Sequence, residues 1–204
     1  MQDLTRTSLL AASALSMLLV FRACGPVAHS ASTGSPAPVQ TSRSTARAAV
    51  AHETPVPPEV NPPGDIPDSQ AYVEFVSPAG YSLQAPEGWA RTVRGANVTF
   101  RDKFDGLSVE VTTKEQGVAI LRAAAPAASD FTSTTTMLPA GRATEVTYAS
   151  NSEADPVTGK KIRLANEAVI FAHGARYTTL RVWAPMGADN VDQWNYIKRN
   201  FRFR

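Results

Sequence analysis

Residues 175–204 constrain the fold most strongly, because they combine a strand pattern, a turn and a helix pattern. Leu180 and Val182 point to one side of an extended segment, while Tyr177, Thr179 and Trp183 point to the other. Apolar or aromatic side chains on both sides predict a strand that is contacted on both faces of its sheet. Pro185 and Gly187 end this pattern.

A helix is predicted after this turn, with Asp189 or Asn190 as its N-cap. Spacings of three to four residues predict one apolar face, made by Val191, Trp194, Ile197 or the stem of Lys198, and Phe201.

Composition divides the rest of the chain into a tail and a core. The 15 prolines are concentrated before residue 90, whereas the aromatic residues lie almost entirely after residue 70. Residues 25–68 are rich in Pro, Ser and Ala and contain few large apolar side chains, which predicts a disordered linker. His29 and His52 are expected to be solvated there. The globular domain is predicted to span residues 69–204.

Residues 1–24 have the pattern of an export signal. Arg6 precedes an uncharged apolar run, Ser8–Phe21, that is shorter than the roughly 20 residues a membrane-spanning helix needs. The sequence around Cys24, the single cysteine, resembles the lipobox of bacterial lipoproteins, although Arg22 departs from that pattern. The resemblance implies lipidation of Cys24. The alternatives are a simple secretion signal, cleaved after a residue such as Ala28 or Ser30, and an uncleaved anchor.

Strand patterns dominate the predicted domain and are joined by turn signals. The expected strands cover residues 71–76, 81–85, 89–93, 97–102, 107–112, 143–149 and 161–172, with an extended arm at 132–136, and are followed by the C-terminal strand described above. Asp105-Gly106 and His173-Gly174 are the expected hairpin turns. One further helix is predicted at 116–128, limited by Pro126. Hairpin-linked strands with two helices predict an α+β domain with a mainly antiparallel sheet.

Three short stretches resemble the PsbP-like lipoproteins. They are Tyr81–Trp89, Phe100–Asp102 and Ala184–Trp194, the last of which runs on to a terminal Phe-Arg-Phe motif. The resemblance implies an α/β/α sandwich over residues 70–204, with a mainly antiparallel central sheet closed by the C-terminal helix. It implies no catalytic residues, because the family shares none. It also implies no single function, since photosynthetic members help to retain ions and to stabilise the oxygen-evolving complex, while many bacterial members have no assigned activity.

Few residues are candidates for catalysis or metal binding. His173, the only histidine after residue 52, has no acidic neighbour in sequence and lies at an expected turn. Asp102 and Asp105 flank a hairpin tip, and Asp189 and Asp192 lie in the first turn of the last helix. Turn formation and helix capping account for these acids, so the sequence assigns no metal site and no cofactor.

The net charge of +2 is not gathered into one basic block, which argues against a nucleic-acid partner. If the basic residues converge in space, they could meet anionic lipids or an acidic partner. These residues are Arg91, Arg94, Arg101, Lys103, Lys160, Lys161, Arg163, Lys198, Arg199, Arg202 and Arg204.

The function predicted from the sequence is that of a non-enzymatic binding or accessory module. It would be held by a lipid at the outer face of a bacterial cell membrane and would recognise an envelope protein or a small apolar ligand. The alternatives are an extracytoplasmic, hydrolase-like enzyme built from acidic and hydroxyl residues, and a structural envelope protein. For localisation, the alternative is secretion.

Overall fold

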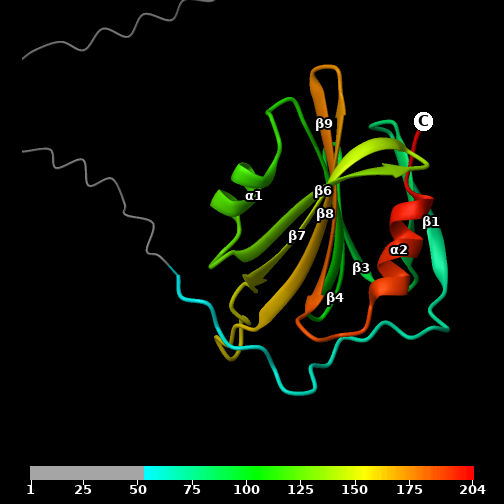
Figure 1. Ribbon diagram of the computed structural model, residues 1–204. Coiled ribbons are helices and arrows are strands. Elements are labelled where there is room, and N and C mark those ends of the chain that lie inside the picture. The colour runs from blue at the N-terminus through cyan, green and yellow to red at the C-terminus, as the bar shows by residue number, and fades with distance from the viewer. Residues whose placement is uncertain (1–52) are drawn as a thin grey trace, which may run out of the picture. The chain divides into compact units, whose positions relative to one another are not determined.

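The computed structural model describes residues 53–204, which form an α+β fold with antiparallel sheets and two helices (Figure 1). The strands are β1 (Tyr72–Ser77), β2 (Tyr81–Pro86), β3 (Ala90–Arg94), β4 (Asn97–Asp102), β5 (Asp105–Thr112), β6 (Ser129–Leu138), β7 (Gly141–Asn151), β8 (Arg163–His173), β9 (Arg176–Pro185) and β10 (Arg202–Phe203). The helices are α1 (Val118–Ala124) and α2 (Val191–Asn200). The predicted α+β class with a mainly antiparallel sheet is therefore confirmed.

Seven strands form the larger sheet, in the order β3-β4-β5-β9-β8-β7-β6. All of its neighbouring strands are antiparallel. A smaller sheet contains β1, β2 and β10, so the terminal Phe-Arg-Phe motif adds a short strand that the sequence pattern did not predict. Helix α2 and β1 lie on one side of the large sheet, and α1 lies on the other (Figure 1).

Each face of the large sheet has its own apolar cluster. The larger cluster joins β2, β4, β5, β8 and β9 to α2 through fully buried residues such as Leu83, Leu107, Phe171, Ile197 and Phe201. On the α1 side, a smaller cluster is made by Val146, Tyr148, Ala168 and Ile170. Polar side chains cover much of the remaining surface on the α1 side. An open groove lies on this part of the sheet.

Helix α2 differs in detail from its predicted apolar face. Ile197 and Phe201 are fully buried, as predicted, but Val191 is 63% exposed and Gln193 is buried instead. The amide of Gln193 donates a hydrogen bond to Asp68 Oδ1 at 3.0 Å, so a polar partner outside the helix satisfies it. Asn190 is the N-cap residue, yet its side chain makes no capping hydrogen bond.

Residues 53–68, which we call the strap, differ from the predicted disordered linker because the folded domain holds them. Asn151 accepts a hydrogen bond from the Val56 amide at 3.0 Å. The Asn190 side chain accepts from the Ile66 amide at 2.6 Å and donates to the Gly64 carbonyl at 2.7 Å. Composition gave no sign of these long-range contacts. Residues 1–52, which include the predicted signal, Cys24, His29 and His52, lie outside the described residues.

The β4–β5 hairpin turns two residues earlier than predicted. Asp102 pairs with Asp105, so Lys103 and Phe104 form the turn, and Asp105 and Gly106 belong to β5. Gly106 is needed for close packing, because a Cβ atom at this position would lie 1.9 Å from Trp183 Cζ2. The glycine that suggested a turn in the sequence therefore makes room for an indole ring on β9.

Candidate functional site: a polar groove on the sheet

An open groove of about 690 Å³ lies on the α1 side of the large sheet. Its floor comes from strands β3, β4, β5, β7, β8 and β9, and Leu121, Ala124, Ala125 and Pro126 in and after α1 form one wall. We call it the sheet groove. Its volume falls within the roughly 300–1,000 Å³ that small-molecule sites occupy.

A row of hydroxyl groups crosses the floor of the sheet groove. The strand register places Thr92 beside Thr99, and Thr99 beside Ser108, on three neighbouring strands. Residues that pair directly across antiparallel strands project from the same face. The row continues on β9 with Arg181, the partner of Ser108. Three hydroxyls that can donate or accept hydrogen bonds thus lead to a guanidinium.

Larger side chains flank this row on both sides. One neighbouring row contains Arg101, Gly106 and Trp183, and the other contains Arg94, Asn97 and Glu110. All of these except Gly106 line the groove. The small side chains of the hydroxyl row therefore lie at the bottom of a trough with charged walls.

Positive charge predominates among the groove residues. Arg101 forms an exposed ion pair with Glu153, at 3.3 Å. Within residues 53–204, neither Arg94 nor Arg181 forms an ion pair. Glu110 is the one other acidic residue among those lining the groove. Two guanidinium groups are thus left to bind an external acceptor.

Trp183 holds Arg181 on the groove side of β9. The Arg181 guanidinium carbon lies 4.5 Å from the centre of the indole, within the range of a cation–π contact. Trp183 is itself buried and packs with Ile162, Leu164 and Phe104. A guanidinium held against a fixed ring loses less side-chain entropy on binding a ligand than a freely rotating one.

A buried hydroxyl lies at the α1 end of the sheet groove. Tyr148 is 4% exposed and lines the groove, and its ring stacks on Phe131 with the centroids 5.0 Å apart. Its hydroxyl has no hydrogen-bond partner within the described residues. Leaving such a group unpaired costs roughly 1–3 kcal/mol.

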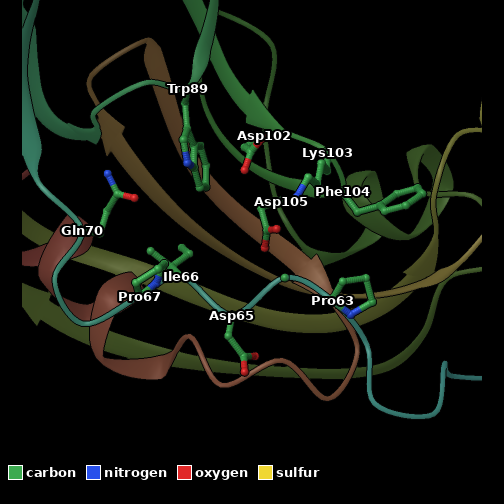
Figure 2. A pocket seen from close by; sticks show the side chains of 11 residues that line it. Pro63, Asp65, Ile66, Pro67, Gln70, Trp89, Asp102, Lys103, Phe104 and Asp105 are labelled. Atoms are coloured by element: carbon green, nitrogen blue, oxygen red, sulfur yellow. The ribbon is translucent and has the colours of Figure 1, made fainter.

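A second, smaller cavity of about 120 Å³ lies between the strap and the β4–β5 hairpin (Figure 2). Asp102 and Asp105 project into it from the hairpin, opposite Ile66 of the strap. Asp105 is buried, and within residues 53–204 its side-chain hydrogen-bond partner is Asn190, whose amide nitrogen lies 3.4 Å from Oδ1. The carboxyl group thus lies next to the amide that holds the strap.

Burial, and then the nearby charges of Asp102 and Asp65, together raise the pKa of Asp105 from 3.8 to about 7. Because the pKa in the folded state exceeds that in the unfolded chain, the contribution of Asp105 to stability is fully present below about pH 4. It is lost as the pH rises through about 7.

Asp105→Asn is expected to make the protein less sensitive to pH, because the amide stays neutral. The free energies of unfolding of the two proteins should diverge as the pH rises, and the variant should be more stable by about 2 kcal/mol at pH 8. Urea unfolding at pH 4.5, 6 and 8 would measure this. Asp130→Asn, at an exposed position, is the matched control. Parallel curves for wild type and Asp105→Asn would contradict the prediction.

The other residues tested for chemistry from the sequence lie elsewhere. His173 is exposed at the end of β8, with its ring against Phe203 at 4.4 Å, and lines neither cavity. The Asp189 amide donates a hydrogen bond to Asp65 at 2.9 Å, so Asp189 helps to hold the strap. Within residues 53–204, no group of three or more His, Cys, Asp or Glu side chains could hold a metal ion.

The predicted basic residues do not gather into one surface. Lys160 and Lys161 pair with Glu59 and Glu53 of the strap, at 3.0 and 2.8 Å. Arg163 is buried and donates to Asn151, and Arg204 pairs with Glu74. Most of the basic residues that a shared lipid-binding patch would need are therefore paired with acidic residues, buried or located elsewhere. Arg94 and Arg101 lie in the sheet groove instead.

Lys198 lies in a buried ionic cluster rather than on the surface. Its ammonium group pairs with Glu145 on β7, at 2.7 Å, and with Glu167 on β8. Burial, and then a hydrogen bond with Glu145, raises the pKa of Glu167 to about 7. That same hydrogen bond between the two glutamates is the main cause of the lowered pKa of Glu145. The cluster joins α2 to the large sheet.

Sequence reasoning missed the groove residues Thr92, Thr99, Ser108 and Arg181. The alternation of apolar and polar residues along β4 and β5 did predict a polar side to each strand. Their convergence depends on the strand order, in which β9 lies next to β5 although far from it in sequence.

Comparisons with known proteins do not show a family for this chain. No family model matches it, and no curated protein matches it. One solved structure with partial similarity is a crystal structure from Bacteroides thetaiotaomicron VPI-5482, with a TM-score of 0.43 and 10% sequence identity. The match covers 64% of this chain and 48% of that protein, so the chain spans about half of its length.

Proposed function

We propose that this chain is a non-enzymatic binding module that holds a small polar ligand in the sheet groove. The observation that carries the proposal is the groove itself, at about 690 Å³, with hydroxyl and guanidinium groups converging on its floor. This polar lining favours a polar ligand over the small apolar ligand expected from the sequence.

The cellular setting belongs to the same proposal. Lipidation of Cys24 would hold the domain at the outer face of the cell membrane, and residues between Cys24 and the strap would set its reach. A tether raises the effective concentration of the domain near envelope ligands. Within residues 53–204, no helix is long and apolar enough to cross a membrane. We further propose a PsbP-like sandwich for the domain, in which α2 is the closing helix.

The test uses two variants of the full chain, expressed in a bacterial host. Cys24→Ala is expected to move the protein from the membrane fraction to the soluble fraction. Thr99→Trp should fill the groove, so that a small molecule that mass spectrometry detects with the wild type is lost. Thr134→Trp, on an exposed strand outside the groove, is the matched control.

Two outcomes would contradict this proposal. Retention of Cys24→Ala in the membrane fraction would exclude the lipid anchor. An unchanged set of bound molecules in Thr99→Trp, with its fold verified by circular dichroism, would exclude the groove as the binding site. Recovery of a chemically altered product would instead favour the hydrolase alternative.

A further inference from the structure

We infer that the ligand of the sheet groove is a hydroxylated oxyanion, a small molecule that carries a carboxylate or phosphate together with hydroxyl groups. This inference rests on the proposed binding function and adds the ligand's charge and chemical class. Two features of the groove support it: two arginines that form no ion pair within residues 53–204, and the row of hydroxyl groups on the floor.

Arg181 and Arg94 supply the recognition of charge. Guanidinium groups match carboxylate and phosphate oxygens with two parallel hydrogen bonds, which makes these pairs strong and directional. Arg181 is only partly exposed and is stacked on Trp183, so it is both desolvated and oriented. Arg94 is exposed at the end of β3, on the rim of the groove, where its side chain is free to change conformation when a ligand binds. An oxyanion would therefore bind at Arg181, with Arg94 as a second cation.

Hydroxyl groups supply the remaining contacts. Thr92, Thr99 and Ser108 lie side by side on the floor and can each donate and accept a hydrogen bond. A ligand with several hydroxyl groups would satisfy them better than an apolar molecule.

The acidic residues of the groove set limits on the ligand. Glu153 neutralises Arg101, so Arg101 contributes little free charge. Glu110 lies in the row of Arg94 and Asn97, one strand away from Arg181. It can accept hydrogen bonds from ligand hydroxyls, and it would repel a ligand that carried negative charge along its whole length. A compact anion with a hydroxylated body fits this arrangement.

The test compares three ligands that share one skeleton, glucose 6-phosphate, glucuronate and glucose, by calorimetric titration of the full chain at low ionic strength. At least one of the two anions is expected to bind at least about tenfold more tightly than glucose. Which of the two binds more tightly separates a phosphate source from a carboxylate source. Raising the salt concentration should weaken the binding of the anions more than that of glucose.

Arginine variants connect this affinity to the groove. Arg181→Met should weaken the binding of the tighter anion by about tenfold or more, and Arg94→Met, at the exposed rim three strands away, by about two- to fivefold. Arg94 is exposed, so its variant keeps the test valid if Arg181→Met fails to fold. Arg91→Met is the matched control, because Arg91 lies on the same strand as Arg94 but packs over Phe75 at 5.7 Å. Its affinity should equal that of the wild type.

Several results would overturn the inference, and they are distinguishable from failure of the proposed function. Equal affinity for glucose and both anions, or no binding of either anion, would exclude an oxyanion site. If Thr99→Trp still lost a copurifying molecule, groove binding would stand and only the ligand class would be wrong. Anion binding that survives in Thr99→Trp would place it outside the groove and contradict both.

Discussion

Replacement of Lys198 by methionine is expected to destabilise the domain by about 3 kcal/mol, because it removes the cation that pairs with two buried glutamates. Glu145 and Glu167 would remain close together between α2 and the sheet, with side chains 20% and 13% exposed. Methionine keeps the length and apolar stem of lysine, so lost packing contributes little. Urea unfolding monitored by Trp fluorescence would measure the change.

The loss should depend on pH in a defined direction. Without Lys198, burial and mutual repulsion would raise the folded-state pKa of both glutamates above that of the unfolded chain. Stability gained from protonation is then present at low pH and lost as the pH rises through the folded-state pKa values. Lys198→Met should therefore lie closer to the wild type at pH 5 than at pH 8.

Two further variants make this prediction specific. Arg199→Met removes the next, exposed cation of α2 and should change the free energy of unfolding by no more than about 0.5 kcal/mol. Glu167→Gln added to Lys198→Met should recover part of the loss, since only one carboxylate then remains. Equal effects of Lys198→Met and Arg199→Met would show that the cluster does not join α2 to the sheet.

Local patterns were sufficient to predict most elements of the fold. In β4 and β5, buried residues such as Val98, Phe100 and Leu107 alternate with more exposed ones, and such alternation identifies a strand without knowledge of its neighbours. The His173-Gly174 turn was found for a similar reason, because Gly174 has a φ of 57° there. Helix α1 was predicted too long, and it ends just before Pro126.

Contacts between distant segments could not be predicted in this way. Asn190 lies at the start of α2, as predicted, but its side chain binds the strap. Its partner Ile66 is 124 residues away in the sequence. The sequence pattern allows the stem of Lys198 on the apolar face of the helix and counts its charge among the basic surface residues, but it does not predict a buried ionic cluster. The two partners of Lys198 lie on β7 and β8 and become neighbours only when the sheet forms. The sheet groove depends on the strand order for the same reason.

Gly106 and Trp183 show how such a contact can mislead a sequence pattern. Asp-Gly is a strong hairpin signal because glycine readily adopts the positive φ angles of tight turns. Gly106 is not among the glycines with positive φ, so its backbone conformation is open to other residues. The indole of Trp183, which lies across it, is the reason for a glycine here. Glycine can therefore indicate either a positive φ angle in a turn or, as at Gly106, a lack of space for a side chain.

Gly106→Ala is accordingly expected to destabilise the domain by about 3 kcal/mol, near the upper end for an overpacked core. The added methyl group would lie 1.9 Å from Trp183 Cζ2 and 2.1 Å from Cε2, so the indole or the strand must move. Because Arg181 is stacked on that indole, the ligand affinity of the sheet groove should fall as well. Thermal unfolding and calorimetric titration would measure the two effects.

Two further variants test whether the loss of stability comes from the contact with Trp183 or from the replacement of any glycine. Gly117→Ala meets no atom within 4 Å and should stay within about 1 kcal/mol of the wild type. Trp183→Leu would remove the clash, so Gly106→Ala combined with it should cost less than the sum of the two single changes. Strict additivity would mean that the two side chains do not meet and would contradict the prediction. Sub-additivity would instead establish that Gly106 is required by the ring that orients Arg181.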